Sequence, residues 1–257
     1  MTGPPARRIG VCVPAHNEAE NIVGCVDALA RAAGRVSCPV LVVIVADRCT
    51  DDTAELARQA ALAGGLQLRV LAVQAGSVGA ARAAGLATLI SSLGVAGSWL
   101  ATTDADSRVP ADWLTGQLRY ARAGAELVVG TVDVTDWSAH PAQLRTQVAA
   151  DYARRRDLTH GHVHGANLGF AAGGYLRIGG FAPVTAHEDV MLVRAAERLG
   201  LSIRWAEDLP VNTSARLVAR APAGFAHYLS LASLALLAVS PDRLAVSRQQ
   251  AAAPARS

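Results

Sequence analysis

Lysine is absent from this chain of 257 residues, so arginine provides all 24 basic side chains. The formal net charge of +3 is too small to predict a nucleic-acid partner, although it suits an anionic ligand. Hydrophobic residues make up 51% of the chain and charged ones 18%, a balance typical of a globular protein and not of a disordered one. We predict one domain over 1–240 and a disordered tail over 241–257.

Cysteines and long apolar runs are also scarce. The four cysteines show no C-x-x-C spacing, which predicts reduced thiols and a cytoplasmic location. The first residues lack an apolar segment, so we expect no signal peptide. The longest late apolar stretch, 225–239, contains a histidine and two serines. It is too short and too polar to predict a transmembrane segment, and a helix lying on a membrane surface stays open as an alternative.

Short apolar runs alternate with helical patterns through the first half of the chain. Strands are predicted over 9–13, 40–46, 67–73, 99–103 and 127–134, with helices between them. This alternation is typical of βαβ units and predicts an α/β fold with a mostly parallel, helix-covered sheet. Ligands of such sheets bind at the carboxyl ends of the strands.

One predicted strand ends in two carboxylates, Asp104 and Asp106, with a single alanine between them. Two carboxylates in a dry site need a cation or a proton to offset their repulsion. Oxygen ligands suit Mg²⁺ or Mn²⁺ bridging to phosphate, so the pair indicates a metal site. The alternative is a helix start, which also favours acidic residues.

The pattern changes after residue 134. Helices are predicted over 142–156, 173–178, 187–199 and from 222, strands over 165–170 and 201–205, and irregular structure over 211–220. The arginines at 154–156 fit a solvated helix face near its end. Histidines at 160, 162 and 164 suggest a metal site, but no acid or cysteine completes a ligand set, so sharing one face of a strand is the simpler interpretation.

Five motifs occur in order along residues 9–229, and together they resemble the family 2 glycosyltransferases. They are Val13-Pro14-Ala15-His16-Asn17-Glu18, the segment 45–53, Asp104-Ala105-Asp106, Gly165-Ala166-Asn167 with Gly179-Gly180-Phe181, and His187-Glu188-Asp189. The resemblance implies a GT-A fold with a Rossmann-like nucleotide-binding half over about 9–134 and an acceptor half over about 135–240. It also implies inverting transfer of one sugar from a nucleoside-diphosphate sugar, UDP before GDP, to a hydroxyl acceptor.

The resemblance assigns donor-binding roles to residues in the first half. Pro14, Ala15 and Glu18 would line the nucleotide pocket, and Asp47 would accept a hydrogen bond from the base. The segment that closes over the base would contain Gly79 and Arg82. Each role has a structural alternative: Glu18 as an acidic residue in the first turn of a helix, Asp47 as a turn or capping residue, and Gly79 as a helix-packing residue.

The resemblance also implies a divalent ion, Mn²⁺ or Mg²⁺. Asp106 would bind it directly and Asp104 would contact the ribose or a metal-bound water. His227 is a candidate third ligand, with an ordinary helix histidine as the alternative. Arg216 and Arg220 match a segment that closes over the diphosphate, but their spacing also fits a surface pair.

Asp189 matches the general base of the family, which deprotonates the acceptor hydroxyl, and Glu188 would bind acceptor or sugar. The alternative for both is stabilisation of a helix N-terminus. The Q-x-x-R-W motif of processive synthases is absent, which favours a single transfer. Two other functions stay open, a nucleotidyltransferase of similar fold and a non-catalytic nucleotide-sugar-binding module, and a homodimer is possible.

Overall fold

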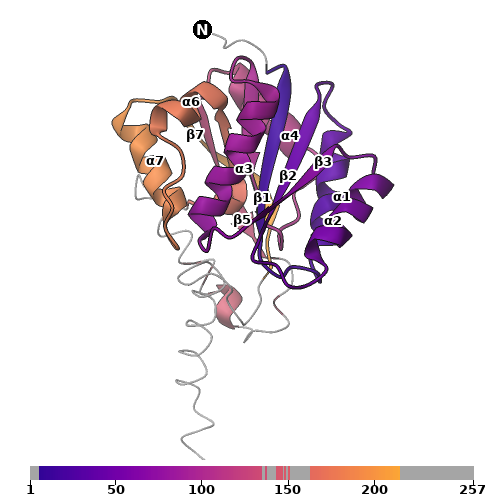
Figure 1. The fold of residues 1–257 in the computed structure, drawn as a ribbon. Helices are drawn as coiled ribbons and strands as arrows, with labels where there is room; N and C mark the ends of the chain where they lie inside the picture. The colour runs from indigo at the N-terminus through magenta and orange to yellow at the C-terminus, as the bar shows by residue number, and fades with distance from the viewer. Residues whose placement is uncertain are drawn as a thin grey trace, which may run out of the picture.

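The computed structural model describes residues 6–134, 137, 143–146, 148, 150 and 163–214 (Figure 1). Its elements in chain order are β1 (Arg8–Ala15), α1 (Ile22–Ala33), β2 (Val40–Asp47), α2 (Thr53–Ala63), β3 (Leu68–Val73), α3 (Val78–Leu93), β4 (Ser98–Thr102), α4 (Trp113–Arg122), β5 (Leu127–Asp133), the 3-10 turn η1 (Gly165–Asn167), β6 (Leu168–Ala171), α6 (Ala172–Ile178), α7 (Glu188–Arg198) and β7 (Ile203–Asn212). The predicted strands and helices of the first half are all present.

Seven strands form one sheet in the order β3-β2-β1-β4-β6-β5-β7. Strands β1 to β4 are parallel, and β5 is parallel to β7. Only β6 runs against its neighbours β4 and β5. The sheet is therefore mostly parallel and covered by helices, which confirms the predicted fold class.

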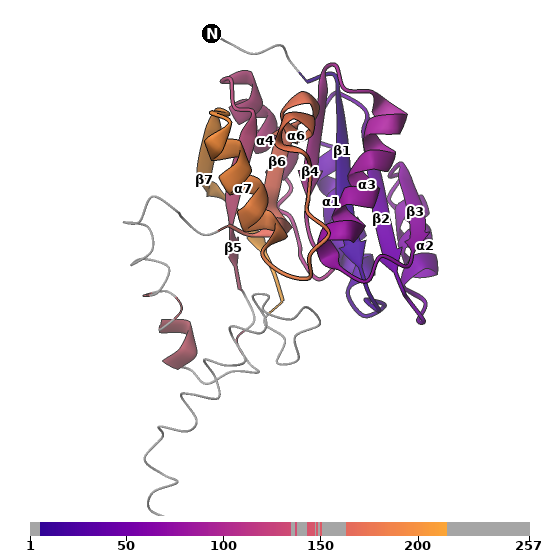
Figure 2. The same cartoon turned by 60° about the vertical axis from the view of Figure 1, so that its left-hand side comes forward.

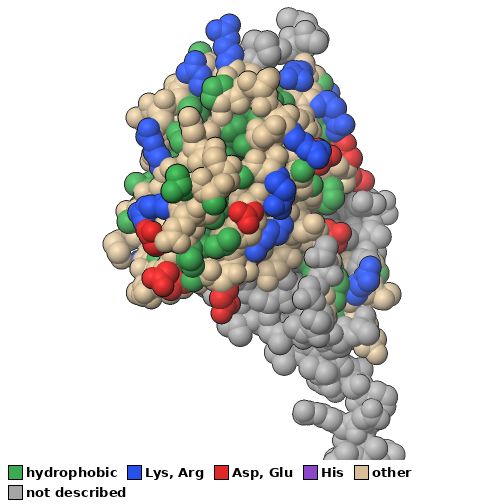
Figure 3. Space-filling view, turned by 90° about the vertical axis from the view of Figure 1, so that its right-hand side faces the viewer, with side chains coloured by type: hydrophobic (Ala, Val, Ile, Leu, Met, Phe, Trp, Pro, Cys, Tyr) green, Lys and Arg blue, Asp and Glu red, His purple; other side chains and the backbone are tan. Residues whose placement is uncertain are grey.

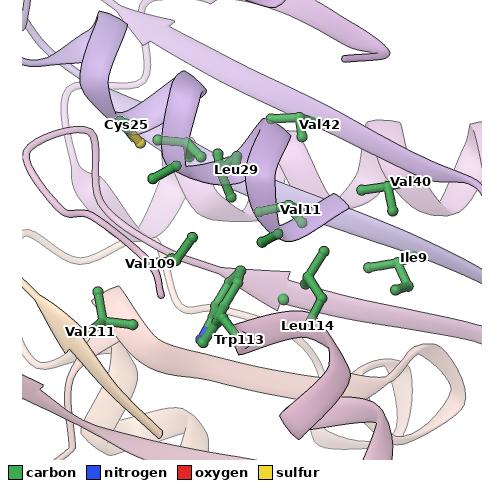
Figure 4. Close-up of a cluster of buried hydrophobic side chains, with 14 of the residues drawn as sticks. Ile9, Val11, Cys25, Leu29, Val40, Val42, Val109, Trp113, Leu114 and Val211 are labelled. Atoms are coloured by element: carbon green, nitrogen blue, oxygen red, sulfur yellow. The ribbon is translucent and has the colours of Figure 1, made fainter. Parts of the chain in front are cut away.

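Helices cover both faces of the sheet, so each face has its own hydrophobic core (Figure 2). Side chains of alternate strand residues divide between the two cores because successive residues point to opposite faces. One core contains residues from α1, α2 and α4; in it Trp113 and Leu114 lie close to Val11 and Leu29 (Figure 4). The other contains residues from α3, α6 and α7. Burial of each large side chain stabilises the fold by about 1.5–3 kcal/mol.

Strand β1 continues through Pro14, where the sequence predicted its end. The Ile9 N–H donates to the carbonyl of Pro39 beside β2. Backbone groups of successive residues point to opposite neighbours, so those of Cys12 and Pro14 point toward β4. Pairing with β4 ends at Cys12, two residues before Pro14. The missing N–H of Pro14 therefore costs no hydrogen bond of the sheet.

Strand β7 is longer than predicted, extending to Asn212 where irregular structure was expected from residue 211. Its pairing with β5 shifts register between Gly130 and Val132, and its buried positions follow no strict alternation. A bulge of this kind removes the period-two pattern by which a strand is recognised in sequence. The segment predicted as a strand over 165–170 divides into η1 and β6.

None of the described helices is long and apolar enough to cross a bilayer. The face seen in Figure 3 carries basic side chains, all of them arginine, distributed together with acidic ones. The predicted helix from 222 and the predicted tail over 241–257 lie outside the described residues.

Candidate functional site

The loops after β1, β2 and β4 meet at one edge of the sheet, because these neighbouring strands are parallel. Pro14 and Ala15 end β1, half-buried and buried respectively. Glu18 is buried, and its N–H donates to Thr53 Oγ1 at 2.8 Å. The Glu18 carboxylate accepts from Asn21 Nδ2 at 2.9 Å. Glu18 lies before α1 and not in its first turn, so its carboxylate contacts the residue that precedes the helix, at the predicted edge of the sheet.

Asp47 is the last residue of β2 and is buried. Its Oδ1 accepts from the N–H of Ala75 at 2.8 Å, and its Oδ2 from the N–H of Gly76 at 3.0 Å. The carboxylate therefore fastens the loop after β3 to the end of β2. Asp47 acts as a turn residue here, and the loop that it holds lies at the edge predicted to bind the base.

Gly79 lies in the first turn of α3 and packs against the loop before α7. A Cβ added to Gly79 would lie 2.0 Å from the carbonyl oxygen of Ala182, and the Gly79 N–H donates to the carbonyl of Val184. Only glycine allows so close an approach of the two backbones. The packing alternative for Gly79 is thus present in the structure, and it places the start of α3 against the segment that leads to Glu188.

Arg82 has a different environment from the one the resemblance implies. Arg82 is 3% exposed, and its guanidinium binds two carboxylates: Nη2 donates to Asp104 Oδ1 at 2.5 Å, and Nη1 donates to Glu188 Oε1. The segment that contains Arg82 is the one predicted to close over the base, and within it the fork of Arg82 faces two protein carboxylates. The cation that offsets the charge of Asp104 is therefore, at least in part, an arginine of the chain itself.

Burial and ion pairing shift the pKa values of Arg82 and Glu188 in this network. Burial alone would lower the pKa of Arg82, but Asp104 and Glu188 raise that pKa above its ordinary value. Burial raises the pKa of the Glu188 carboxyl, and the nearby guanidinium of Arg82 offsets part of that rise. Two carboxylates held by one buried arginine form a network in which removal of the cation leaves two unpaired charges.

Asp106 is half-buried, and Ser107 Oγ lies 3.4 Å from its Oδ1. Among the described residues, no cluster of three histidine, cysteine or acidic side chains could hold a metal by itself. Mg²⁺ is commonly bound by one or two carboxylates together with substrate phosphates and water, so a single carboxylate still fits such an ion.

Asp189 is half-buried at the start of α7 and is held by two backbone donors. The Gly165 N–H donates to its Oδ2 at 2.8 Å, and the Val190 N–H donates to its Oδ1 at 2.7 Å. The second contact is the helix-start alternative predicted for this residue. The first contact joins Asp189 to η1. This turn lies next to the end of β4 in space, because Thr102 Oγ1 donates to the Gly165 carbonyl.

Gly165 and Asn167, which the sequence placed only in a motif, make hydrogen bonds that position the candidate site. Asn167 is buried, and its side chain bonds to Trp113 Nε1 and to the carbonyls of Thr131 and Leu209. Asn167 therefore joins α4, β5 and β7 and fixes η1 in place. Nothing in the sequence pairs Gly165 with Asp189 or Arg82 with Glu188, because these contacts depend on tertiary structure.

Three non-glycine residues of the described chain have left-handed backbone conformations, and each adjoins a candidate residue. They are Asn17 before Glu18, Arg48 after Asp47 and His187 before Glu188. Such conformations are uncommon outside glycine and often mark functional loops. Arg216, Arg220 and His227, together with the residues at 154–156, 160 and 162, lie outside the described residues.

The fold is similar to those of solved sugar transferases. TarS of S. aureus, in complex with UDP-GlcNAc, matches with a TM-score of 0.59 and 16% identity over 79% of this chain and 57% of the TarS chain. Glucosyl-3-phosphoglycerate synthase of Mycobacterium tuberculosis, with Mn²⁺, UDP and glucosyl-3-phosphoglycerate, matches with 0.55 and 22% over 90% and 78%. Mannosyltransferase PcManGT of Pyrobaculum calidifontis, with GDP-Man and Mn²⁺, matches with 0.61 and 18% over 97% and 82%.

These identities are low, so the structural matches show a shared fold, and the chain spans less than two thirds of the TarS structure. A search of curated proteins with the sequence finds no match. The family model described as Glycosyl transferase family 2 matches residues 10–176, which is more than half of the chain and includes Asp47, Asp104 and Asp106. The chain therefore belongs to glycosyl transferase family 2.

Proposed function

We propose that the protein transfers one sugar, with inversion, from a nucleoside-diphosphate sugar to a hydroxyl acceptor. The observation that supports this most is that one buried arginine joins Asp104, at the predicted donor edge, to Glu188, beside the predicted base. The two motifs that we propose to serve donor and acceptor are thereby linked through Arg82, although 84 positions separate Asp104 from Glu188 in the chain (188 − 104).

Asp189 is the proposed general base. It takes the proton of the acceptor hydroxyl while that oxygen forms a bond to the anomeric carbon, and the bond from that carbon to the diphosphate breaks on the opposite face. Its two backbone hydrogen bonds hold the carboxylate in place, and each carboxylate oxygen retains a further lone pair for the hydroxyl. Glu188, which is paired with Arg82, is proposed to contact acceptor or sugar.

A divalent ion, Mn²⁺ or Mg²⁺, is part of the proposal. Asp106 would hold it together with the donor phosphates, and Asp104 would contact the ribose or a metal-bound water. When bound, the ion supplies positive charge that stabilises the departing diphosphate. Mn²⁺ accompanies a nucleotide in two of the structural neighbours. UDP is the proposed nucleotide, with GDP second; two of the three neighbours described above hold UDP or a UDP-sugar, and one holds GDP-Man.

The cytoplasm is the proposed location. All four cysteines of the chain lie in its described part, and all are free thiols. Burial raises the pKa of Cys12 and of Cys25 to about 12, so these thiols stay protonated and unreactive. A reducing compartment suits such a set.

A thermal-shift screen with UDP, GDP, UDP-GlcNAc and GDP-Man, each with and without Mn²⁺, tests donor binding. A ligand present at about 100 times its Kd stabilises the native state by about 2.7 kcal/mol. We expect a shift that requires Mn²⁺, that is lost in Asp106→Asn, and that survives in Asp112→Asn, a matched exposed carboxylate at the start of α4. The absence of any shift with all four ligands would contradict the proposal.

Release of nucleoside diphosphate from the donor then tests catalysis. Binding without release against a panel of hydroxyl acceptors would instead identify a nucleotide-sugar-binding module. Release of pyrophosphate from a nucleoside triphosphate would identify a nucleotidyltransferase. Both of these outcomes reject the proposed transfer.

A further inference from the structure

Arg82 lies early in α3 and is enclosed on several sides. A Cβ added to Gly165 would lie 2.4 Å from its Cζ, so the backbone of η1 passes directly over the guanidinium. The ring of Phe181 lies 5.7 Å from the same atom. Arg82 is only 3% exposed, so its guanidinium is placed to bind groups of the protein itself.

Two separate nitrogens of Arg82 contact two separate carboxylates. Nη2 binds Asp104, in the loop after β4, and Nη1 binds Glu188, the first residue of α7. A guanidinium is planar and rigid, so this arrangement sets the distance between the two carboxylates. Lysine offers a single ammonium nitrogen and could not reproduce the same geometry.

A second link runs parallel to this one. Thr102, at the end of β4, donates to the carbonyl of Gly165, and the N–H of Gly165 donates to Asp189. The end of β4 is therefore joined to the start of α7 twice, once through a side chain and once through the backbone of η1.

We propose that Arg82 is a positioning residue, which holds the start of α7, and with it Asp189, at a defined distance from Asp104. The inference rests on the proposed function in one respect, namely that Asp104 faces the donor and Asp189 the acceptor. It goes beyond that function by assigning to a buried residue of the first half the alignment of the base in the second half. A displacement of about 1 Å at such a group lowers turnover about a hundredfold.

Amide hydrogen exchange without any ligand provides the first test. The variants are Arg82→Lys, which keeps the charge but not the fork, and Arg177→Lys, a matched control at the exposed ion pair with Glu126. In Arg82→Lys we expect exchange about tenfold faster or more at Gly165 and at 188–191, with unchanged exchange in α1. Exchange in Arg177→Lys should match the wild type at both places.

Two results of this first test would overturn the inference. Unchanged exchange at 188–191 in Arg82→Lys would show that the fork does not hold α7. An increase in exchange at 188–191 that is no larger than the increase in α1 would show that Arg82 serves overall stability only. Arg82→Met, which also removes the charge, gives the same comparison in a second variant if Arg82→Lys fails to fold.

Exchange in the presence of UDP and Mn²⁺ separates this inference from the proposed function. In the wild type we expect protection at 98–107 and also at 188–191, and in Arg82→Lys protection at 98–107 alone. Loss of UDP binding in Arg82→Lys would show that Arg82 binds the nucleotide, and would overturn the inference. Absence of protection at 98–107 in the wild type would reject the proposed donor site, while the ligand-free comparison would still decide the role of Arg82.

Discussion

The two halves of the sheet hold their acidic residues in different ways. In the first half, Asp47 is held by backbone amides of the loop after the neighbouring strand, at Ala75 and Gly76. In the second half, Glu188 is held by an arginine 106 positions earlier in the chain. The edge at Asp47 is therefore held by contacts between adjacent βα units, whereas the start of α7 depends on a contact with the first half of the chain.

This difference follows from the connectivity of the strands. Parallel neighbours joined by short βα units bring their carboxyl ends together without further contacts. The antiparallel β6 enters between β4 and β5, so the segment leading to α7 must be fastened to the end of β4 by side chains and by η1. We infer that a substitution in the first half, at Arg82, should displace the proposed base. A substitution of the proposed base should leave nucleotide binding at the opposite edge unchanged.

Asp189→Asn is expected to have the largest effect, and it tests the second part of that inference. Loss of a general base lowers turnover by about 10²–10⁴-fold. The amide oxygen of asparagine can still accept from the Gly165 N–H, so we expect little change in stability and an unchanged Kd for UDP with Mn²⁺. Initial rates of nucleotide release and calorimetric titration measure the two quantities.

The control for Asp189→Asn is Asp208→Asn, which affects an exposed carboxylate paired with Arg119. Its turnover should equal that of the wild type. Turnover by Asp189→Asn at the wild-type rate would remove Asp189 from the reaction.

Arg82→Met tests whether damage in the first half reaches the second. It leaves Asp104 and Glu188 without their shared cation, and removal of one partner from a buried ion pair costs about 3–5 kcal/mol. Chemical denaturation measures the free energy of unfolding. Arg177→Met breaks a pair whose side chains are 56% and 34% exposed, and should change stability little. Equal losses in the two variants would contradict the importance of the buried network.

The sequence predicted the first half of the fold well because its signals are local. The fully buried β2 is an unbroken apolar run that ends at Asp47, and both features are visible in the sequence. The place of β6 between β4 and β5 is not visible, because strand order depends on packing among distant segments. The extension of β7 was missed because the bulge opposite Gly130 removes its alternation.

The candidate site divides in the same way. Asp104, Asp106, Glu188 and Asp189 were recognisable as acidic residues after a strand or at a helix start, in motifs that resemble a family. Their partners were not recognisable. The contact of Arg82 with Glu188 exists only in the folded chain, and the resemblance alone placed Arg82 in the segment that closes over the base.

Gly79→Ala should have an intermediate effect, because it affects the contact between α3 and the loop before α7. The new methyl group would lie 2.0 Å from a backbone carbonyl that cannot rotate away, so the loop must move. Overpacking of this kind costs about 1–3 kcal/mol of stability. Because the loop leads to α7, its displacement should lower the turnover number by a larger factor than it weakens the affinity for UDP. Gly173→Ala in α6 is the matched control, since the nearest atom would lie 3.9 Å away. It should be neutral or slightly stabilising, as alanine favours helices.

Glu188→Gln should give the smallest effect, visible as a change in pH dependence. Burial raises the pKa of Glu188 in the folded state, so the folded protein binds a proton more tightly than the unfolded chain. The stability from this group is therefore fully present below the unfolded pKa of about 4.3 and is lost as the pH rises through the folded pKa. Relative to Glu188→Gln, the wild type should lose stability over that range. Denaturation at several pH values from about 4 to about 8 measures the difference between the two proteins. A difference that is independent of pH would contradict the raised pKa, because it would mean that the ion pair with Arg82 offsets the whole effect of burial on the Glu188 carboxyl.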